Sequence, residues 1–246
     1  MALSPEERAC YEWQIWVPGF GEAGQEKLKE ATVMVSRCGG LGGVVALELA
    51  AAGIGRLIIA HGGEVKPSDL NRQILQTWDA IDQPRIVSIE HRLKELNPRL
   101  DLVLEDGNVT EDNAERLVGA ADLVVDCAPL FEERYLMNRE CVRQGKVMVE
   151  AAMFDLQGQV TTIDPGRTPC LRCLYPQAPR AWKREFPVFG AVSATVGSIA
   201  AMEAIKVISE IGEPLYSSML SFDLRAARFW RAEIERRTDC VACGEC

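Results

Sequence analysis

Residues 32–53 read TVMVSRCGGLGGVVALELAAAG, and this stretch decides the fold of the chain. Thr32 to Val35 are short, apolar or β-branched, which is typical of a buried parallel strand. Val44 to Ala52 are predicted to form an apolar helix, whose N-terminus presents free N–H groups to an anion such as phosphate. A tight turn without a ligand is the alternative for such a loop. The glycines between strand and helix let the backbone turn and a ligand approach; they are Gly39, Gly40, Gly42 and Gly43.

The segments that follow alternate between strands and helices. This alternation predicts a parallel sheet with right-handed crossovers. The expected strands are 56–60, 102–104, 123–126 and 147–149, and the expected helices are 84–96, 114–118 and 132–144.

The pattern changes after residue 150. Gly158 to Ile163 alternate and predict an antiparallel strand, while Ala194 to Ile208 predict an apolar helix. Residues 217–223 and 228–233 are expected to close the sheet as a hairpin. The sequence therefore predicts an α/β fold whose mostly parallel, Rossmann-like sheet is continued by antiparallel strands.

Composition narrows the class of protein. A chain of 246 residues with 48% hydrophobic and 26% charged residues can bury a full α/β core. Its formal charge of −9 makes a nucleic-acid partner unfavourable. We find no apolar run long enough to span a bilayer and no signal-peptide pattern, so we expect a cytoplasmic protein without a membrane partner.

Four of the nine cysteines form two C-x-x-C pairs, Cys170 with Cys173 and Cys240 with Cys243. Each pair can bring two thiolates to one ion, so the two pairs predict a closed, structural zinc site with four cysteine ligands. Chance spacing or a redox C-x-x-C is the alternative. The site would attach the C-terminal tail to the loop that follows Ile163.

These features together resemble one family, the ThiF/MoeB/HesA group, which is related to the ubiquitin-activating enzymes. The resemblance covers nearly the whole chain, in one consistent order. The matching stretches are Pro18-Gly19-Phe20-Gly21, Gly39-Gly40-Leu41-Gly42, Ser68-Asp69-Leu70-Asn71-Arg72-Gln73, Asp82-Gln83-Pro84-Arg85, Val125-Asp126-Cys127, Gly158-Gln159-Val160, the C-x-x-C pairs and Met202-Glu203-Ala204-Ile205-Lys206.

The resemblance implies an activity and a domain organisation. Family members are homodimers with zinc that bind ATP and Mg²⁺ and transfer AMP to a carboxylate. That carboxylate is often the C-terminus of a ubiquitin-like sulfur carrier, and a small-molecule acid is equally expected. We expect one domain over residues 1–246, with a nucleotide-binding half at 1–150 and an antiparallel, zinc-binding half at 151–246.

The resemblance also implies the site residues. Arg72 matches the family's phosphate-binding arginine, and Arg85 stands where the family usually has a lysine. We expect both to clamp phosphates as the catalytic residues, although both could instead pair with carboxylates. The expected nucleotide contacts are Gly39, Gly40, Leu41, Gly42, His61, Asn71, Arg72, Gln73, Arg85 and Asp126.

Several positions depart from the family pattern. Arg37 replaces the first glycine of the loop and is expected either to clamp phosphate or to close the pocket. His61 and Gly63 stand where the family has an acidic pair, one member of which holds the ribose hydroxyls. Asp69 replaces an asparagine, and Pro129 replaces the aspartate that meets Mg²⁺. Asp126, Glu132 and Asp69 are the remaining candidates for that metal, unless they are ordinary solvated or capping carboxylates.

Two further departures concern the partner and the reaction. Trp13 replaces an arginine donated across the dimer, and Lys183 lies about where some members have a catalytic cysteine. Aromatic residues favour interfaces, so Tyr11, Trp13 and Trp16 are expected at a dimer contact unless they pack on their own subunit.

Three functions compete at this point. The first is an adenylyltransferase that forms no thioester of its own. The second is a catalytically degenerate member that acts as a dimeric scaffold or binding module. The third, a nicotinamide-dependent oxidoreductase, needs an acid near the end of the second strand, where His61 stands instead.

Overall fold

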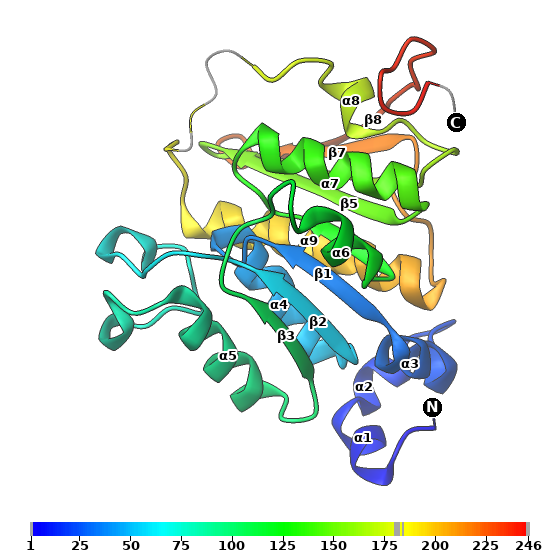
Figure 1. Ribbon diagram of the computed structural model, residues 1–246. Coiled ribbons are helices and arrows are strands. Elements are labelled where there is room, and N and C mark those ends of the chain that lie inside the picture. The colour runs from blue at the N-terminus through cyan, green and yellow to red at the C-terminus, as the bar shows by residue number, and fades with distance from the viewer. Residues whose placement is uncertain (1, 180–182, 184, 245–246) are drawn as a thin grey trace.

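The computed structural model describes residues 2–179, 183 and 185–244 of the chain. Its centre is an eight-stranded sheet in the order β3-β2-β1-β4-β5-β6-β7-β8 (Figure 1). Strands β1 to β5 are parallel, and β6 to β8 continue the sheet in antiparallel pairing. The strands are β1 (Thr32–Ser36), β2 (Arg56–Ala60), β3 (Asp101–Glu105), β4 (Leu123–Asp126), β5 (Val147–Phe154), β6 (Gln157–Ile163), β7 (Ser218–Asp223) and β8 (Arg228–Glu233).

Helices cover both faces of the parallel part. α3, α4, α5 and α9 share one core with one face of the sheet, and α6 and α7 pack on the other face. The described α-helices are α1 (Pro5–Cys10), α2 (Glu12–Ile15), α3 (Gly21–Glu30), α4 (Gly40–Ala52), α5 (Arg85–Leu96), α6 (Ala114–Gly119), α7 (Phe131–Gln144), α8 (Leu171–Leu174) and α9 (Gly190–Ser209). Short 3-10 turns lie at Pro67–Asp69 and Trp78–Ala80.

Strand β1 shows how the sequence divides between the two cores. Val33 and Val35 face α4 and α9, whereas Met34 between them faces α6 and α7. Successive side chains of a strand point to opposite faces, so an uninterrupted apolar strand serves two helical layers. This confirms the buried parallel strand predicted at residues 32–35.

Strand order sets the position of the candidate site. In the sheet, β2 and β3 lie on one side of β1, and β4 and β5 lie on the other side. Ligands of open α/β sheets bind beyond the carboxyl ends of the strands at such a reversal. Here the reversal lies between β1 and β4, directly beside the glycine loop.

Two predicted helices begin earlier than expected. α4 starts at Gly40 rather than Val44, and α9 starts at Gly190 rather than Ala194. Glycine has a low intrinsic helix propensity, but tertiary packing overrides it here. At Gly197, a Cβ atom would lie 2.7 Å from Val44 Cβ and 2.9 Å from Leu41 O, so a glycine is needed for α9 to approach α4 closely.

The expectation that no segment is apolar enough to cross a membrane was wrong for α9. Residues Gly190–Ser209 meet that criterion, with a mean hydropathy of 1.5. The helix packs on α3, α4, β5 and β6, and this internal position accounts for its apolar composition.

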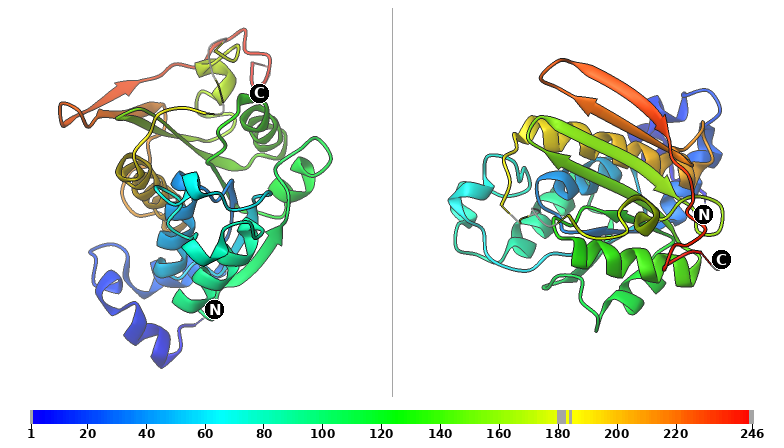
Figure 2. Two further views of the ribbon diagram at one scale, coloured as in Figure 1. Left: turned by 90° about the vertical axis from the view of Figure 1, so that its left-hand side faces the viewer. Right: turned by 90° about the horizontal axis from the view of Figure 1, so that it is seen from above.

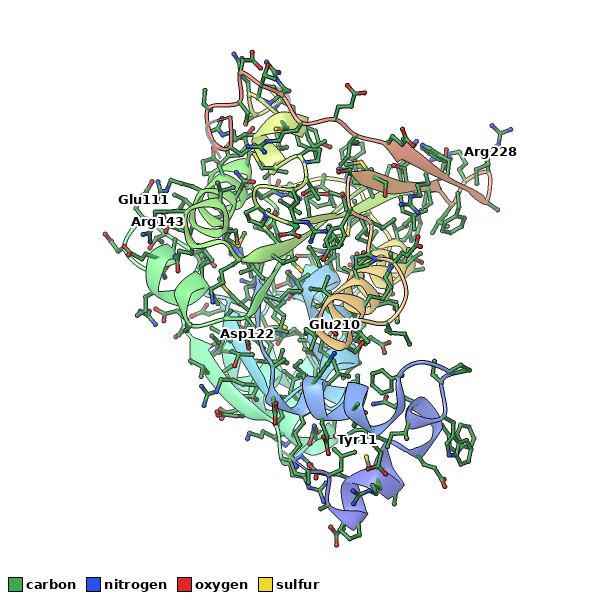
Figure 3. The ribbon with its side chains drawn as sticks, turned by 90° about the vertical axis from the view of Figure 1, so that its right-hand side faces the viewer. Tyr11, Glu111, Asp122, Arg143, Glu210 and Arg228 are labelled. Atoms are coloured by element: carbon green, nitrogen blue, oxygen red, sulfur yellow. The ribbon has the colours of Figure 1, made fainter. Side chains whose placement is uncertain are left out.

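The N-terminal helices and the C-terminal segment lie at opposite ends of the molecule (Figures 1 and 2). The β7–β8 hairpin projects from the body of the protein, and Arg228 lies near its tip (Figures 2 and 3). Every residue of β8 is exposed, including Phe229 and Trp230. This part of the sheet is therefore not covered by the described part of the chain.

The aromatic residues near the N-terminus divide into two groups. Tyr11 is buried in its own chain against Gly53 and Asn97, so its expected role at a dimer contact was wrong (Figure 3). Trp13 and Trp16 remain 81% and 65% exposed. The difference arises because α1 and α2 turn one side toward α3 and α4 and the other toward solvent.

Candidate nucleotide and metal sites

The glycine loop joins the end of β1 at Ser36 to the start of α4 at Gly40. At Gly42, a Cβ atom would lie 2.4 Å from Arg37 O, so this close turn requires a glycine. No described side chain caps the N-terminus of α4. The first N–H groups of this 13-residue helix can therefore meet an anion.

A cavity of about 120 Å³ lies over this loop, and we call it the crevice. Seven of the predicted nucleotide contacts line it, namely Gly39, Gly40, Leu41, His61, Arg72, Gln73 and Arg85. Gly42 lies beneath the loop, and exposed Asn71 accepts a hydrogen bond from Arg72 instead. The crevice is thus built from segments that follow β1 and β2 at the carboxyl edge of the sheet.

Arg85 is held by Asp69 at the back of the crevice. Its Nη2 lies 2.8 Å and its Nε 3.3 Å from Asp69 Oδ2, and its Nη1 donates to Gly62 O. Asp69 Oδ1 accepts a hydrogen bond from Gln73 Nε2 at 2.8 Å. Burial alone would raise the pKa of Asp69, but the bonds from Arg85 and the backbone of Lys66 hold that pKa below its usual range. Arg85 is therefore an oriented cation with a carboxylate partner, rather than a free clamp.

Arg72 is less constrained. Its Nη1 donates to Ser68 O and Asn71 Oδ1, and its Nη2 lies 3.7 Å from Asp69 Oδ1, beyond hydrogen-bond distance. Its side chain is about a third exposed, whereas that of Arg85 is buried. Of the two predicted phosphate clamps, Arg72 has more freedom to meet a ligand.

Arg37 forms an ion pair that its position in the sequence does not predict. Its Nε lies 2.7 Å from Glu133 Oε2, and its Nη2 contacts Glu133 Oε1. Both side chains are buried, and the pair joins the end of β1 to the first turn of α7 across the reversal in strand order. Arg37 has a φ of 59°, a conformation that favours glycine. Arginine at this loop position thus takes a strained backbone conformation. Its charge is paired with a carboxylate that lies 96 residues away in the sequence.

His61 lies directly after β2 and faces the crevice. Burial, with the nearby Arg85 and Arg37 guanidiniums, lowers the pKa of His61 to about 3. The imidazole is therefore neutral at physiological pH. Its Nδ1 atom is buried without a hydrogen-bond partner among the residues that the structure describes. It can accept a hydrogen bond from a bound hydroxyl group.

Asp126 belongs to a different cluster. Its Oδ2 accepts a hydrogen bond from Arg134 Nε at 2.9 Å, and its Oδ1 accepts one from Ala128 N at 3.0 Å. Arg134 also pairs with Glu150, and all three side chains are buried. Asp126 is therefore a buried partner of Arg134 and does not line the crevice, contrary to the predicted nucleotide contact.

Mg²⁺ does not fit the carboxylates of the crevice. The ion usually binds one or two carboxylates together with the phosphates. Asp69 is the only carboxylate among the described lining residues, and both its oxygens are engaged. Pro129 lines the crevice without offering a ligand, and Glu132 lines a separate cavity beside α7.

A second pocket, which we call the groove, lies near the crevice, and a small cavity shares lining residues with both. A small cavity shares Leu41, Cys127, Pro129 and Met153 with the crevice, and it shares Arg134, Ala152 and Met153 with the groove. Met153 lines all three cavities. A ligand lying along β5 could therefore reach the glycine loop.

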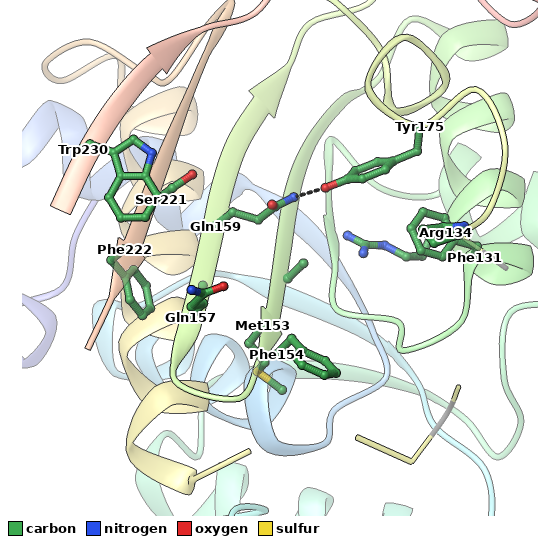
Figure 4. Close-up of a pocket in the computed structure, with 13 residues that line it drawn as sticks. Phe131, Arg134, Met153, Phe154, Gln157, Gln159, Tyr175, Ser221, Phe222 and Trp230 are labelled. Carbon is green, nitrogen blue, oxygen red and sulfur yellow. Dashed lines mark hydrogen bonds between the residues drawn. The ribbon is translucent and has the colours of Figure 1, made fainter. Parts of the chain in front are cut away.

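The groove itself lies on the open face of β5, β6 and β7 and has a volume of about 220 Å³ (Figure 4). Phe131, Phe154 and Trp230 supply apolar walls, and Gln157 and Gln159 supply polar side chains. Gln159 Nε2 donates to Tyr175 Oη at 2.7 Å across its floor. This combination suits an extended, mostly apolar ligand with a polar end.

The four cysteines of the two C-x-x-C pairs meet beside α8. Their sulfur atoms all lie within 4.8 Å of one another. Cys170 Sγ is 3.6 Å from Cys240 Sγ, and Cys173 Sγ is 3.5 Å from Cys243 Sγ. Four sulfurs at about 2.3 Å from a tetrahedral ion would be about 3.8 Å apart, so the cluster has the size of a metal site.

The cysteine cluster connects segments that are distant in sequence. Cys173 Sγ accepts a hydrogen bond from Arg237 N at 3.5 Å. Leu171 N, between the first two cysteines, donates to Asn138 Oδ1 on α7 at 2.8 Å. A bound ion would thus attach the C-terminal tail to the α7 layer. Lys183 is exposed in the segment between α8 and α9.

The sequence is similar to several characterised proteins. The model of the ThiF family matches residues 11–242. The heterocyst protein HesA of Trichormus variabilis is 45% identical over 242 residues, covering 98% of this chain and 91% of that protein. The sulfur carrier protein adenylyltransferase of Thermus thermophilus is 37% identical over 254 residues, covering 100% of this chain and 94% of that protein.

A solved structure shows the same fold. E. coli MccB, determined with ATP, is 25% identical and superimposes with a TM-score of 0.80. The match covers 90% of this chain and 68% of that chain. This likeness agrees with the α/β fold described above.

Proposed function

Because the chain belongs to the ThiF family, whose members include ATP-dependent adenylyltransferases, we propose that it activates a carboxylate as an acyl-adenylate. The observation that carries this proposal is that a small cavity shares its lining residues with both the crevice and the groove. A nucleotide over the glycine loop and a carboxylate entering along β5 would meet beside Leu41 and Met153. A protein that binds only a nucleotide would not need the groove beside the crevice.

The reaction requires positioning and charge neutralisation more than covalent participation by the protein. A carboxylate oxygen attacks the α-phosphorus, the bond to the bridging oxygen breaks, and pyrophosphate leaves. The N-terminus of α4 and Arg72 hold the phosphates, with Arg85 fixed behind them by Asp69. His61 Nδ1 accepts a hydrogen bond from a ribose hydroxyl, in the place of the acid that the family pattern has there.

The acceptor is the C-terminus of a ubiquitin-like carrier protein or a small acid used in cofactor or metallocofactor biosynthesis. The groove supports an extended end group, because its apolar walls reach Met153, which also lines the small cavity next to the crevice. Lys183 offers no thiol, so the acyl group would leave as the adenylate rather than as an enzyme thioester.

A degenerate member that serves as a scaffold is the alternative. The pairing of Arg37 with Glu133 and of Arg85 with Asp69 favours it, because each pair leaves less positive charge for a nucleotide. The two functions differ in whether ATP binds.

Replacing Arg72 with alanine is expected to abolish stabilisation by ATP. At a hundred times its dissociation constant, ATP should stabilise the wild-type protein by about 2.7 kcal/mol, which is roughly 5–10 °C in melting temperature. The variant loses the least constrained phosphate donor of the crevice. Thermal denaturation with and without nucleotide measures the difference, and Arg92→Ala, a surface arginine on α5, is the control.

Pyrophosphate exchange provides the second readout. Exchange that depends on an added carboxylate would support the adenylyltransferase. If the wild-type protein shows neither a nucleotide-dependent shift nor exchange with any carboxylate, the proposal fails and the scaffold takes its place.

The cysteine cluster is proposed to hold one structural Zn²⁺, since four thiolates in two C-x-x-C pairs are a typical zinc set. We also propose a cytoplasmic location, because thiolate ligands of zinc must stay reduced and that compartment keeps cysteines reduced. We retain one domain over residues 1–246, with nucleotide bound by 1–150 and zinc by 151–246.

The protein is also proposed to form a homodimer. Trp13 and Trp16 expose large indole surfaces on α2 and just after it, and such residues are enriched at interface centres. The mass in solution at micromolar concentration should be twice that of the chain. Trp13→Ser should shift it toward the monomer, and a monomeric wild-type protein would exclude the dimer.

A further inference from the structure

We propose that this crevice neutralises the nucleotide's phosphates with three guanidiniums instead of a protein-bound Mg²⁺. The inference rests on the proposed function, since it assumes that a nucleotide binds. Arg37, Arg72 and Arg85 line the crevice around the glycine loop. Their three positive charges face two carboxylates, Asp69 and Glu133, and His61 adds none because it is neutral.

The carboxylates leave part of each guanidinium available. A guanidinium has five N–H donors. Glu133 occupies Nε and Nη2 of Arg37, and no hydrogen bond from Nη1 is found within the described part of the chain. Arg85 uses one donor each on Nε, Nη1 and Nη2. Both arginines can therefore keep their carboxylate partners and still donate to a phosphate.

Glu133 and Asp69 act as positioning residues in this arrangement. Each holds its arginine by two contacts in a buried setting, so the guanidinium is oriented before a ligand arrives. The N–H groups that the carboxylates leave unused can then donate to phosphate oxygens. The strained backbone of Arg37, at a φ of 59°, places a cation at a loop position where the family pattern has glycine.

The same residues explain why a metal is not needed at the protein. Pro129 removes a carboxylate from the wall of the crevice, and Asp69 is fully engaged. Among the described residues, further carboxylates occur in an outer hollow on the far side of Arg37 and Arg85, where exposed Glu64 and Asp106 belong to the lining. Cations carried by the chain thus line the same cavity as Pro129, the position at which the family pattern has a metal ligand.

The test compares ADP binding to the full-length protein in EDTA and in excess Mg²⁺ by calorimetry. We expect affinities that agree within about threefold, because the arginines provide the neutralisation. A loss of about tenfold or more in EDTA would overturn the inference while leaving nucleotide binding intact. If that loss is found, the double variant Glu64→Gln/Asp106→Asn should be measured in the same two buffers. Equal ADP affinities in EDTA and in Mg²⁺ for this variant would place the metal in the outer hollow. Absence of ADP binding in both buffers would overturn the proposed function as well.

Two variants test the residues directly. Arg37→Gly/Glu133→Gln removes both charges and relieves the backbone at residue 37, so it should fold and bind ADP in EDTA about tenfold more weakly. The control is Arg56→Gln, which removes one surface arginine at the opposite end of β2 from the crevice. This variant should bind ADP as the wild type does. Equal binding by the double variant and the control would overturn the role of Arg37.

A gain of metal dependence is expected from Pro129→Asp. The new carboxylate would face the crevice and give Mg²⁺ a protein ligand, so ADP should bind about tenfold more tightly with Mg²⁺ than in EDTA. An unchanged ratio of the two affinities would overturn the role assigned to Pro129.

Discussion

Replacing Cys173 with serine is expected to lower the melting temperature by roughly 10 °C, corresponding to a loss of about 3 kcal/mol or more. The cluster that contains Cys173 joins α8 to the C-terminal tail, and both depend on the ion for their attachment. The rest of the sheet has its own core and should remain folded. Circular dichroism against temperature measures the loss, and proteolysis should cut the released tail first.

The control for this experiment is Cys10→Ser, which replaces an exposed thiol outside the cluster. It should melt as the wild type does. Metal analysis of protein never exposed to chelator should give about one zinc per chain. A value well under one, or equal melting of both variants, would contradict the structural zinc site.

Replacing Arg134 with methionine is expected to destabilise the protein by about 3–5 kcal/mol. Asp126 and Glu150 would remain buried without their shared cation. Burial already raises the pKa of Glu150, and its Oε2 has no hydrogen-bond partner among the described residues. The free energy of unfolding, measured by urea denaturation, reports the effect.

The loss in Arg134→Met should depend on pH. Without the arginine, burial would hold the pKa of the Glu150 carboxyl in the folded state still further above its value in the unfolded state. Protonation of Glu150 supports folding at low pH, and stability decreases as the pH rises. The destabilisation should therefore be greater at pH 8 than at pH 5.

A triple variant, Arg134→Met/Asp126→Asn/Glu150→Gln, is the matched control for this cluster. It removes all three charges and should recover most of the stability, because no charge is left unpaired. A loss below about 1 kcal/mol in the single variant would show that water or rearrangement solvates the two carboxylates.

Much of the fold could be predicted because its signals are local. The strand at 32–35, the glycine turn and the alternation of strands and helices follow from periods and turn residues in neighbouring positions. The antiparallel continuation after residue 150 was marked by the alternation in Gly158–Ile163. The spacing of Cys170 with Cys173 and of Cys240 with Cys243 likewise predicted the cluster, because each pair is a short local motif.

Helix starts were less predictable, because packing overrides propensity. α4 begins at Gly40 and α9 at Gly190, although glycine is a poor helix former. The close approach of Gly197 to Val44 depends on two helices that are distant in sequence. The apolar composition of α9 likewise has its reason in the core against which the helix packs.

The state of each charged residue in the site was decided by the tertiary structure alone. The sequence predicted Arg72, Arg85 and Asp126 as nucleotide contacts, but it did not predict which residues pair with them. Arg85 meets Asp69 across 16 residues, and Arg37 meets Glu133 across 96 residues. Asp126 is turned away from the crevice by Arg134. A residue type indicates which charge a side chain can carry, whereas only the folded chain determines which opposite charge lies beside it.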